Sequence, residues 1–157
     1  MDAVLAALSA YAHKLTFDDL TAEVVHHAKR TLIDTLGCAL GGYSSETAVI
    51  ARQVAKSVTS TPPSRIIGAA GPGTSTDMAA FANAAEVRYL DCNDTSGVAT
   101  GHPSDMIGAL MAVAEPLGVS GRDFIAAMVA AYEVFGYVSS GLSKRPDRKS
   151  TRLNSSH

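Results

Sequence analysis

The stretch TDMAAFANAAEVRYLDCNDTSGVATGHPSDMIGALMAVAEPL, residues 76–117, decides how this chain folds. Its two ends, residues 76–89 and 104–117, are rich in alanine and have apolar residues at helical spacing. Its middle, residues 90–105, concentrates carboxylates, hydroxyls and one histidine, and is called the polar loop below. Pro103 favours the first turn of a helix, so the second helix is expected to begin beside it. The stretch therefore predicts two helices joined by the polar loop.

The composition favours a mainly α protein. Hydrophobic residues make up 46% of the 157 residues and aromatic residues only 6%, because alanine supplies much of the apolar content. Alanine-rich helices pack closely, so we expect a multi-helix, bundle-like domain. There is no continuous apolar run of about eighteen residues, so no membrane span is expected. The N-terminus lacks the basic start and apolar run of a secretory signal, so we expect a cytoplasmic protein.

Helical patterns continue outside the central stretch. We expect four further helices, at residues 2–13, 21–40, 46–58 and 122–140. Either Thr16, in a capping box with Asp19, or Thr21 is expected to cap the second of these, Gly41 and Gly42 to end it, and Ser44 or Ser45 to cap the third. His26 and His27 are expected on the helix surface, and Tyr132 on the apolar stripe of the last helix. Residues 65–67 are expected to form a short strand, followed by a glycine-rich turn. The apolar stripe expected on the helix at 76–89 consists of Met78, Phe81, Ala82, Ala85 and Tyr89.

The C-terminal residues differ from the rest of the chain. Residues 143–157 lack helical spacing and apolar content, so we expect a disordered, non-native tail after a helical domain at residues 1–142. This tail holds five of the 13 lysines and arginines, and the formal net charge of the whole chain is −2. The domain itself is therefore acidic, and no nucleic-acid partner is expected.

The chain has two cysteines, and both are expected to be free thiols because disulfides are rare inside cells. Cys38 lies in an apolar helical run and is expected in the core. Cys92 lies in the polar loop, where we expect a small buried residue. A nucleophilic Cys92 paired with His102 is less favoured, because no other feature of the sequence indicates acyl transfer.

Four stretches match the motifs of one enzyme family in order. They are residues 29–37 (KRTLIDTLG), residues 83–85 (NAA), the polar loop, and residues 114–134. With these motifs the chain resembles the MmgE/PrpD family over roughly residues 5–140. That family includes 2-methylcitrate dehydratases, cis-aconitate decarboxylases and iminodisuccinate epimerases.

The resemblance implies a helical domain of a homodimeric enzyme several times longer, with a separate α+β lid domain and no metal or organic cofactor. Asp91, Thr95 and His102 fall at the family's acid, threonine and histidine of the catalytic site, although this loop is one residue longer than in some decarboxylases. The family's catalytic lysines lie well downstream and have no counterpart here. We therefore expect an incomplete enzyme that is inactive by itself.

The polar loop suits acid–base chemistry on a small di- or tricarboxylate. Dehydration of a 2-hydroxy acid needs a base for the proton beside a carboxylate and an acid for the leaving hydroxyl. His102 is a candidate for one of them because its ordinary pKa lies near neutrality, and Asp91 is expected to orient the ring or to act as the acid. Thr95 offers a hydroxyl. The residues expected to bind substrate are Asp94, Ser104 and Arg88.

Some polar residues have simpler explanations. Asn93 is expected only to bond local backbone, and Asp94 has about equal claims to that role and to function. Ser104 is also expected to cap the following helix, where Asp105 suits the first turn. Because the loop itself is acidic, most of the positive charge for a polyanionic substrate is expected from elsewhere.

Other functions stay open at this point. Decarboxylation or epimerisation would use the same loop within the family. A metal-binding helical module is a second class, because oxygen ligands and one imidazole would come from Asp91, Asp94, Asp105 and His102. A helical interaction module without chemistry is a third, and its exposed apolar faces would make it self-associate.

Overall fold

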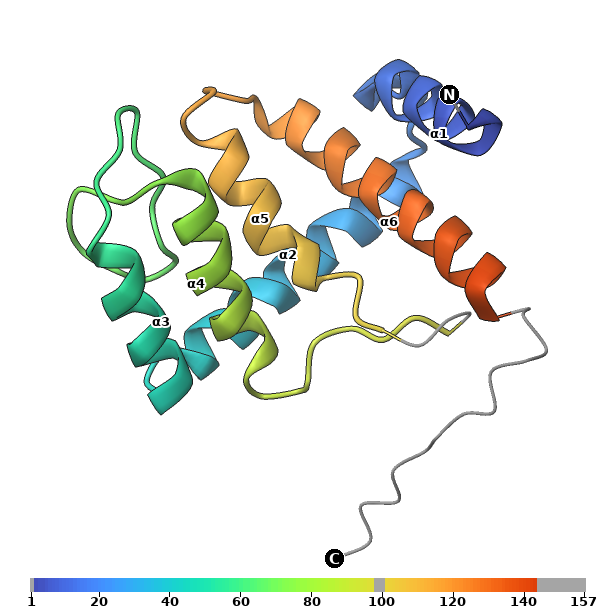
Figure 1. Cartoon of the computed structure of the whole chain (residues 1–157). Coiled ribbons are helices and arrows are strands. Elements are labelled where there is room, and N and C mark those ends of the chain that lie inside the picture. Colours follow the sequence, from blue (N-terminus) through green and yellow to red (C-terminus); the bar gives the residue numbers. More distant parts are fainter. Residues whose placement is uncertain (1, 98–100, 144–157) are drawn as a thin grey trace, which may run out of the picture.

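The computed structural model describes residues 2–97 and 101–143, and within them the chain is helical and contains no strand (Figure 1). The predicted mainly α class is confirmed. The elements are α1 (Ala3–Lys14), the short 3₁₀ helix η1 (Phe17–Asp19), α2 (Ala22–Gly42), α3 (Glu46–Lys56), α4 (Thr76–Arg88), α5 (Asp105–Ala114) and α6 (Gly121–Ser143). The predicted tail lies outside the described residues, apart from Ser143 at the end of α6.

Helix α4 lies at the centre of the domain and contacts α2, α3 and α5. Figure 1 shows α3, α4, α5 and α6 following one another across the view, with α2 running behind them. Helix α6 contacts α5, α2 and α1. The chain between α4 and α5 leaves this row at one edge and reaches α6, where Tyr132 meets Asp94. The polar loop is therefore held between helices that are distant in sequence.

Helices begin at the predicted capping residues. The hydroxyl of Thr21 accepts a hydrogen bond from the backbone N–H of Val24 at 3.3 Å. The hydroxyl of Ser45 accepts one from Ala48 at 3.2 Å. Each bond satisfies a backbone donor that the first turn of a helix leaves without a partner, a contribution of about 1 kcal/mol.

The second helix ends at the predicted pair of glycines, because α2 runs to Gly42. Gly42 also lies at the contact with α4, where a Cβ atom on it would lie 2.3 Å from the carbonyl oxygen of Glu86. On α5, a Cβ atom on Gly108 would lie 2.9 Å from the Cβ of Asn83. Glycine at both crossings lets α2 and α5 approach the backbone of α4 closely.

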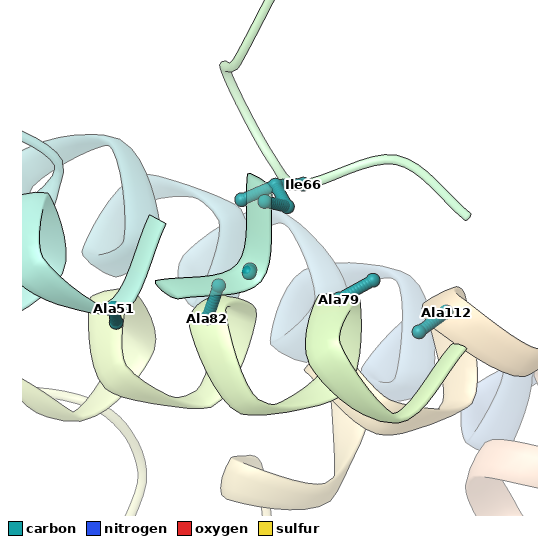
Figure 2. Close-up of a cluster of buried hydrophobic side chains, with 6 residues drawn as sticks. Ala51, Ile66, Ala79, Ala82 and Ala112 are labelled. Atoms are coloured by element: carbon teal, nitrogen blue, oxygen red, sulfur yellow. The ribbon is translucent and has the colours of Figure 1, made fainter. Parts of the chain in front are cut away.

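The core around α4 is built of small side chains. Figure 2 shows alanines from neighbouring helices gathered near Ile66. The cluster consists of Ala51, Ala55, Ile66, Ala79, Ala82 and Ala112. Such small side chains allow close packing of helix on helix at little cost in side-chain entropy.

The buried face of α4 differs from the predicted apolar stripe. Phe81 and Tyr89 are 52% and 51% exposed, whereas Asn83 and Glu86 are fully buried. The amide oxygen of Asn83 accepts a hydrogen bond from the backbone N–H of Ile67 at 2.8 Å. Polar side chains occupy this face because each has a partner inside the domain, which compensates the loss of water.

Arg52 and Glu86 form a buried ion pair between α3 and α4. Their Nη1 and Oε1 atoms are 2.6 Å apart, and the guanidinium of Arg52 lies 3.7 Å from the ring centre of Tyr43. Burial raises the pKa of Glu86, and the hydrogen bond from Arg52 acts in the opposite direction. Among the described residues, Oε2 of Glu86 has no hydrogen-bond partner. The pair joins the two helices and depends on both members.

Residues 65–67 do not form the predicted strand. Instead Ser64 and Thr74 make an isolated antiparallel bridge, in which each backbone N–H donates to the other carbonyl at 2.8 Å. The hydroxyl of Ser64 donates to the carbonyl of Ala112 at 2.7 Å, and that of Thr74 to Ala55 at 2.6 Å. These side-chain bonds fix the connection between α3 and α4, where a lone strand would lack a partner.

Helices α1 and η1 are attached through exposed side chains. Helix α1 buries no residue, and the hydroxyl of Tyr11 donates to Glu133 on α6. Arg122 at the start of α6 forms an ion pair with Asp18. Exposed pairs of this kind contribute little to stability, so this end of the domain is held less firmly than the α4 core.

Helix α6 is more apolar than the sequence analysis recognised. Over Gly121–Gly141 its mean hydropathy reaches 1.3 and 17% of the window is buried, so by length and composition it is able to cross a membrane. Ile125, Ala126 and Met128 of this helix are buried inside the domain. Packing against α2 and α5 is sufficient to explain the apolar character of that face.

Candidate active site

The polar loop begins with a backbone conformation that few residues adopt. Asp91 has a φ of 52°, in the left-handed region where aspartate is tolerated better than most residues with a side chain. Its backbone N–H donates to the carbonyl of Arg88 at 3.2 Å, so the chain turns sharply as α4 ends. The turn places the Asp91 carboxylate next to the guanidinium of Arg88.

Arg88 is shared by two carboxylates. Its guanidinium pairs with Asp91, and its Nε lies 3.8 Å from Oδ2 of Asp105. The hydrogen bond and the charge of Arg88 lower the pKa of Asp91 from its ordinary value, so Asp91 is ionised at neutral pH. The role of Arg88 in substrate binding stays a prediction, and its positive charge is already engaged within the chain.

His102 faces Asp91, and its two ring nitrogens have different surroundings. Nδ1 lies 2.8 Å from the backbone carbonyl oxygen of Asp94. Because a carbonyl only accepts, Nδ1 holds the proton of the neutral ring and Nε2 is the basic nitrogen. Nε2 lies 3.6 Å from Oδ1 of Asp91, and the side chain is 18% exposed. In the neutral ring, Nε2 would therefore be the nitrogen that accepts a proton, beside an ionised carboxylate.

Asp94 uses both carboxylate oxygens inside the protein. Oδ1 accepts a hydrogen bond from the backbone N–H of Ser104 at 3.0 Å, and Oδ2 accepts one from the hydroxyl of Tyr132 at 2.8 Å. Burial and the Asp94 carboxylate raise the pKa of Tyr132, so its phenol stays protonated. Asp94 thus joins the loop to α6, and its predicted role in substrate binding stays a prediction. Sequence reasoning placed Tyr132 on an apolar stripe and missed its hydroxyl.

Asn93 and Ser104 form the buried interior of the loop. The amide of Asn93 donates to Oγ of Ser104 and to Oδ1 of Asp105, at 2.8 Å each. The prediction that the Ser104 side chain caps α5 is wrong, because its hydroxyl makes no capping bond. Ser104 is fully buried, so its hydroxyl faces the loop interior and not solvent. Asn93, expected only to bond local backbone, instead joins the loop to the start of α5.

Thr95 and Cys92 are exposed. The catalytic role of Thr95 stays a prediction, and its hydroxyl is accessible to a ligand. The prediction that Cys92 is buried is wrong. Its Sγ lies 3.6 Å from Sγ of Cys38, which is buried in α2 as predicted.

A hollow of about 450 Å³ is lined by α2 and by Asp94 of the polar loop. It brings His27 and Arg30 to the same space as Asp94. The sequence analysis assigned His27 to the helix surface and did not single out Arg30. The spacing of His27 and Arg30 could have indicated that they lie together, because residues three or four apart share one face of a helix. A larger hollow of about 670 Å³ has a mainly apolar lining and no residue of the loop.

No three histidine, cysteine, aspartate or glutamate side chains within residues 2–97 and 101–143 are placed to hold one metal ion. The four oxygen and nitrogen ligands proposed for a metal-binding module instead bond to arginine, tyrosine, asparagine and backbone groups. The arrangement favours acid–base chemistry over metal binding.

Within the described residues the domain is helical and places an imidazole next to a carboxylate, which is a candidate acid–base site. The MmgE/PrpD N-terminal domain matches residues 6–154, so the chain belongs to the MmgE/PrpD family. The family resemblance drawn from the sequence motifs is confirmed. The matched range continues past residue 142, where the sequence analysis placed the end of the domain.

Named relatives agree with this assignment. The chain is 34% identical to human cis-aconitate decarboxylase over 129 residues, which cover 79% of this chain and 27% of that protein. It is 35% identical to 2-methylcitrate dehydratase of Cupriavidus necator over 129 residues, covering 71% and 25%. It is 31% identical to the mitochondrial 2-methylcitrate dehydratase of Yarrowia lipolytica over 153 residues, covering 86% and 28%. The chain spans about a quarter of the length of these relatives.

Proposed function

We propose that this chain supplies the acid–base loop of a lyase that removes water from small di- or tricarboxylates, as in the 2-methylcitrate dehydratases it is similar to. The observation that supports this most directly is the position of the His102 ring, whose Nδ1 lies 2.8 Å from the Asp94 carbonyl oxygen and whose Nε2 lies 3.6 Å from the ionised Asp91. A base near neutral pH is what removal of a proton beside a carboxylate requires.

In this proposal His102 takes the carbon-bound proton and Asp91 stabilises the imidazolium that results. Asp91 does not serve as the acid, because Arg88 keeps it ionised. Of the two roles that the sequence left open for Asp91, orientation and charge stabilisation are therefore favoured. The acid for the leaving hydroxyl is expected among the lysines that the family resemblance places downstream.

Electrostatics also indicate that further cations take part. Asp91 and Asp105 share the guanidinium of Arg88, and the carboxylate of Asp94 accepts from the neutral Ser104 N–H and Tyr132 hydroxyl, so these loop residues carry more negative than positive charge. A polyanionic substrate would be repelled unless positive charge approached from another side. Arg30 and His27 at the hollow beside Asp94 are one source, and the downstream lysines are a second.

Decarboxylation is a second candidate, because human cis-aconitate decarboxylase is as similar to this chain as the bacterial dehydratase is. The two reactions differ in what the imidazole must do first. Dehydration begins with a neutral base, whereas decarboxylation breaks a carbon–carbon bond and leaves a carbanion that needs a proton. Protonated His102 would supply that proton.

The test is an activity assay of a form of the protein that extends beyond residue 157, with 2-methylcitrate and cis-aconitate supplied separately. We expect water loss from 2-methylcitrate, and a decrease of about 10²–10⁴-fold when His102 is replaced by alanine. His26→Ala is the matched control, because His26 is exposed on α2 and outside the loop. Full activity of the His102→Ala protein would refute the site assignment. Carbon dioxide release from cis-aconitate would favour the second candidate.

We further propose that the enzyme is a cytoplasmic homodimer. Exposed apolar side chains support an association surface, since Ile33 is 70% exposed and Leu117 is 71% exposed. Sedimentation at several concentrations tests it, and a monomer at every concentration would contradict it.

A further inference from the structure

The two cysteines of the chain meet between α2 and the polar loop. Their sulfur atoms are 3.6 Å apart, although 54 residues separate them in sequence. Cys38 is 6% exposed, whereas Cys92 is open to solvent. A disulfide has an S–S distance of about 2.05 Å, so the sulfurs need to approach by only about 1.5 Å.

We propose that Cys38 and Cys92 are a redox-modification site, which hydrogen peroxide converts reversibly to a disulfide that ties the polar loop to α2. In the first step the sulfur of Cys92 attacks one peroxide oxygen. The O–O bond breaks, a sulfenic acid forms on Cys92, and the other oxygen leaves as water with the thiol proton. Sulfur is oxidised by two electrons and the peroxide is reduced by two.

In the second step the sulfur of Cys38 attacks the sulfur of the sulfenic acid. The S–O bond breaks, the S–S bond forms, and the hydroxyl leaves as water with the proton of Cys38. The overall reaction converts two thiols and one peroxide into one disulfide and two waters. A dithiol reductant reverses it by thiol–disulfide exchange.

The surroundings of the two thiols assign these roles. Cys92 is accessible, so it meets the peroxide first. Burial and the neighbouring Cys92 raise the pKa of Cys38 to about 11, so Cys38 stays protonated at neutral pH and does not react directly with the oxidant. Its place next to Cys92 lets it trap the sulfenic acid before a second peroxide oxidises that sulfur further.

The Cys38–Cys92 disulfide would affect the candidate site, because Cys92 lies between two residues of that site in sequence. Asp91 before it pairs with Arg88, and Asn93 after it donates to Ser104. A shift of Cys92 towards α2 pulls on both contacts. The prediction that oxidation lowers activity rests on the proposed function, whereas the prediction that the disulfide forms does not.

The direct test is to treat the native chain with a modest excess of hydrogen peroxide, alkylate the remaining thiols and measure the intact mass. We expect a monomer that has lost both of its alkylatable thiols and the mass of two hydrogen atoms, and that recovers both thiols in dithiothreitol. Retention of both thiols, a covalent dimer, or added oxygen without an S–S bond would each overturn the proposal. None of these readouts depends on activity, so this test can fail while the proposed function holds.

Two variants test the roles separately. In Cys38→Ala the sulfenic acid of Cys92 should persist and be captured by dimedone. In Cys92→Ser the buried Cys38 should keep its thiol under the same treatment. Loss of the Cys38 thiol in this variant at the native rate would overturn the order of the steps. The peroxide experiment on the native chain needs no variant. Its result therefore stands even if Cys38→Ala or Cys92→Ser fails to fold.

Discussion

Two arginine–carboxylate pairs on α4 lie two residues apart and have opposite surroundings. Glu86 pairs with Arg52 inside the domain, where the side chains are 0% and 10% exposed. Arg88 pairs with Asp91 at the surface, where the side chains are 41% and 70% exposed. The same chemical pairing therefore joins two helices in one place and borders a candidate active site in the other.

Burial accounts for the difference. A buried pair cannot exchange its partner for water, so removing one member leaves a charge that nothing compensates. An exposed pair exchanges readily with water or with an incoming ligand, and its net contribution to stability is small. Helix α4 thus carries a buried pair that joins two helices and, at its C-terminal end, an exposed pair that borders the candidate site.

The largest effect is expected from removing the buried arginine. Replacing Arg52 by Met leaves Glu86 without its cation and should lower the free energy of unfolding by about 3–5 kcal/mol, measured by urea denaturation. The double variant Arg52→Met, Glu86→Leu should recover much of the loss, because the buried charge is removed as well. A single variant as stable as the native protein would show that the pair is not structural.

A smaller effect is expected where α2 crosses α4 at Glu86. Gly42→Ala places a Cβ atom against the Glu86 carbonyl, which should reduce the free energy of unfolding by about 1–3 kcal/mol. Gly37→Ala on the same helix is the matched control, because no atom lies within 4 Å of the added Cβ. That change should stabilise the protein by about 0.5–1 kcal/mol. If Gly42→Ala and Gly37→Ala raise the free energy of unfolding equally, the contact between α2 and α4 at Glu86 is not tight.

The pH dependence of stability also separates the two pairs. The folded pKa of Glu86 is raised above its ordinary 4.5, so its stabilising contribution is complete below about pH 4.5 and is lost as the pH rises through the folded value. The pKa of Asp91 is lowered from 3.8, so its contribution has the opposite sign and is lost as the pH falls. In Glu86→Gln, the free energy of unfolding measured by urea denaturation across pH 4–8 should no longer show the decrease with rising pH that is due to Glu86. If the free energies of the variant and of the native protein change in parallel with pH, this prediction is wrong.

The smallest effect on stability is expected at the exposed pair. Arg88→Met should leave the urea midpoint unchanged, because both charges are accessible to water. It should raise the pKa of Asp91 towards its ordinary value, since the largest cause of the lowered pKa is removed. A nuclear magnetic resonance titration of the Asp91 carboxyl measures this shift. A destabilisation similar to that of Arg52→Met would remove the distinction between the two pairs.

Local sequence signals predicted much of the fold. Thr21 and Ser45 mark helix starts that the structure confirms. The buried face of α4 was not predictable from hydrophobic spacing, which assigns Asn83 and Glu86 to the surface. Their partners lie 16 and 34 residues away, and only the packed structure brings them together.

The candidate site was predictable to a similar extent. The polar loop indicated that His102 and Asp91 act together, and the structure places them face to face. The contacts of Asn93 and Tyr132 were not foreseen, because a buried amide and a phenol on an apolar stripe have no local signature. The partner of Tyr132 comes from another part of the fold, and the partners of Asn93 lie at the other end of the polar loop.

A backbone hydrogen bond within the polar loop has a consequence for evolution and engineering. The N–H of Ser96 donates to the carbonyl of Gly101 at 3.0 Å, close in sequence to Asp94 and His102. A proline at position 96 would lack this donor and should loosen the position of the imidazole relative to the Asp94 carbonyl. Substitutions that keep the Ser96 N–H are therefore the ones that evolution and engineering can use at this point of the loop.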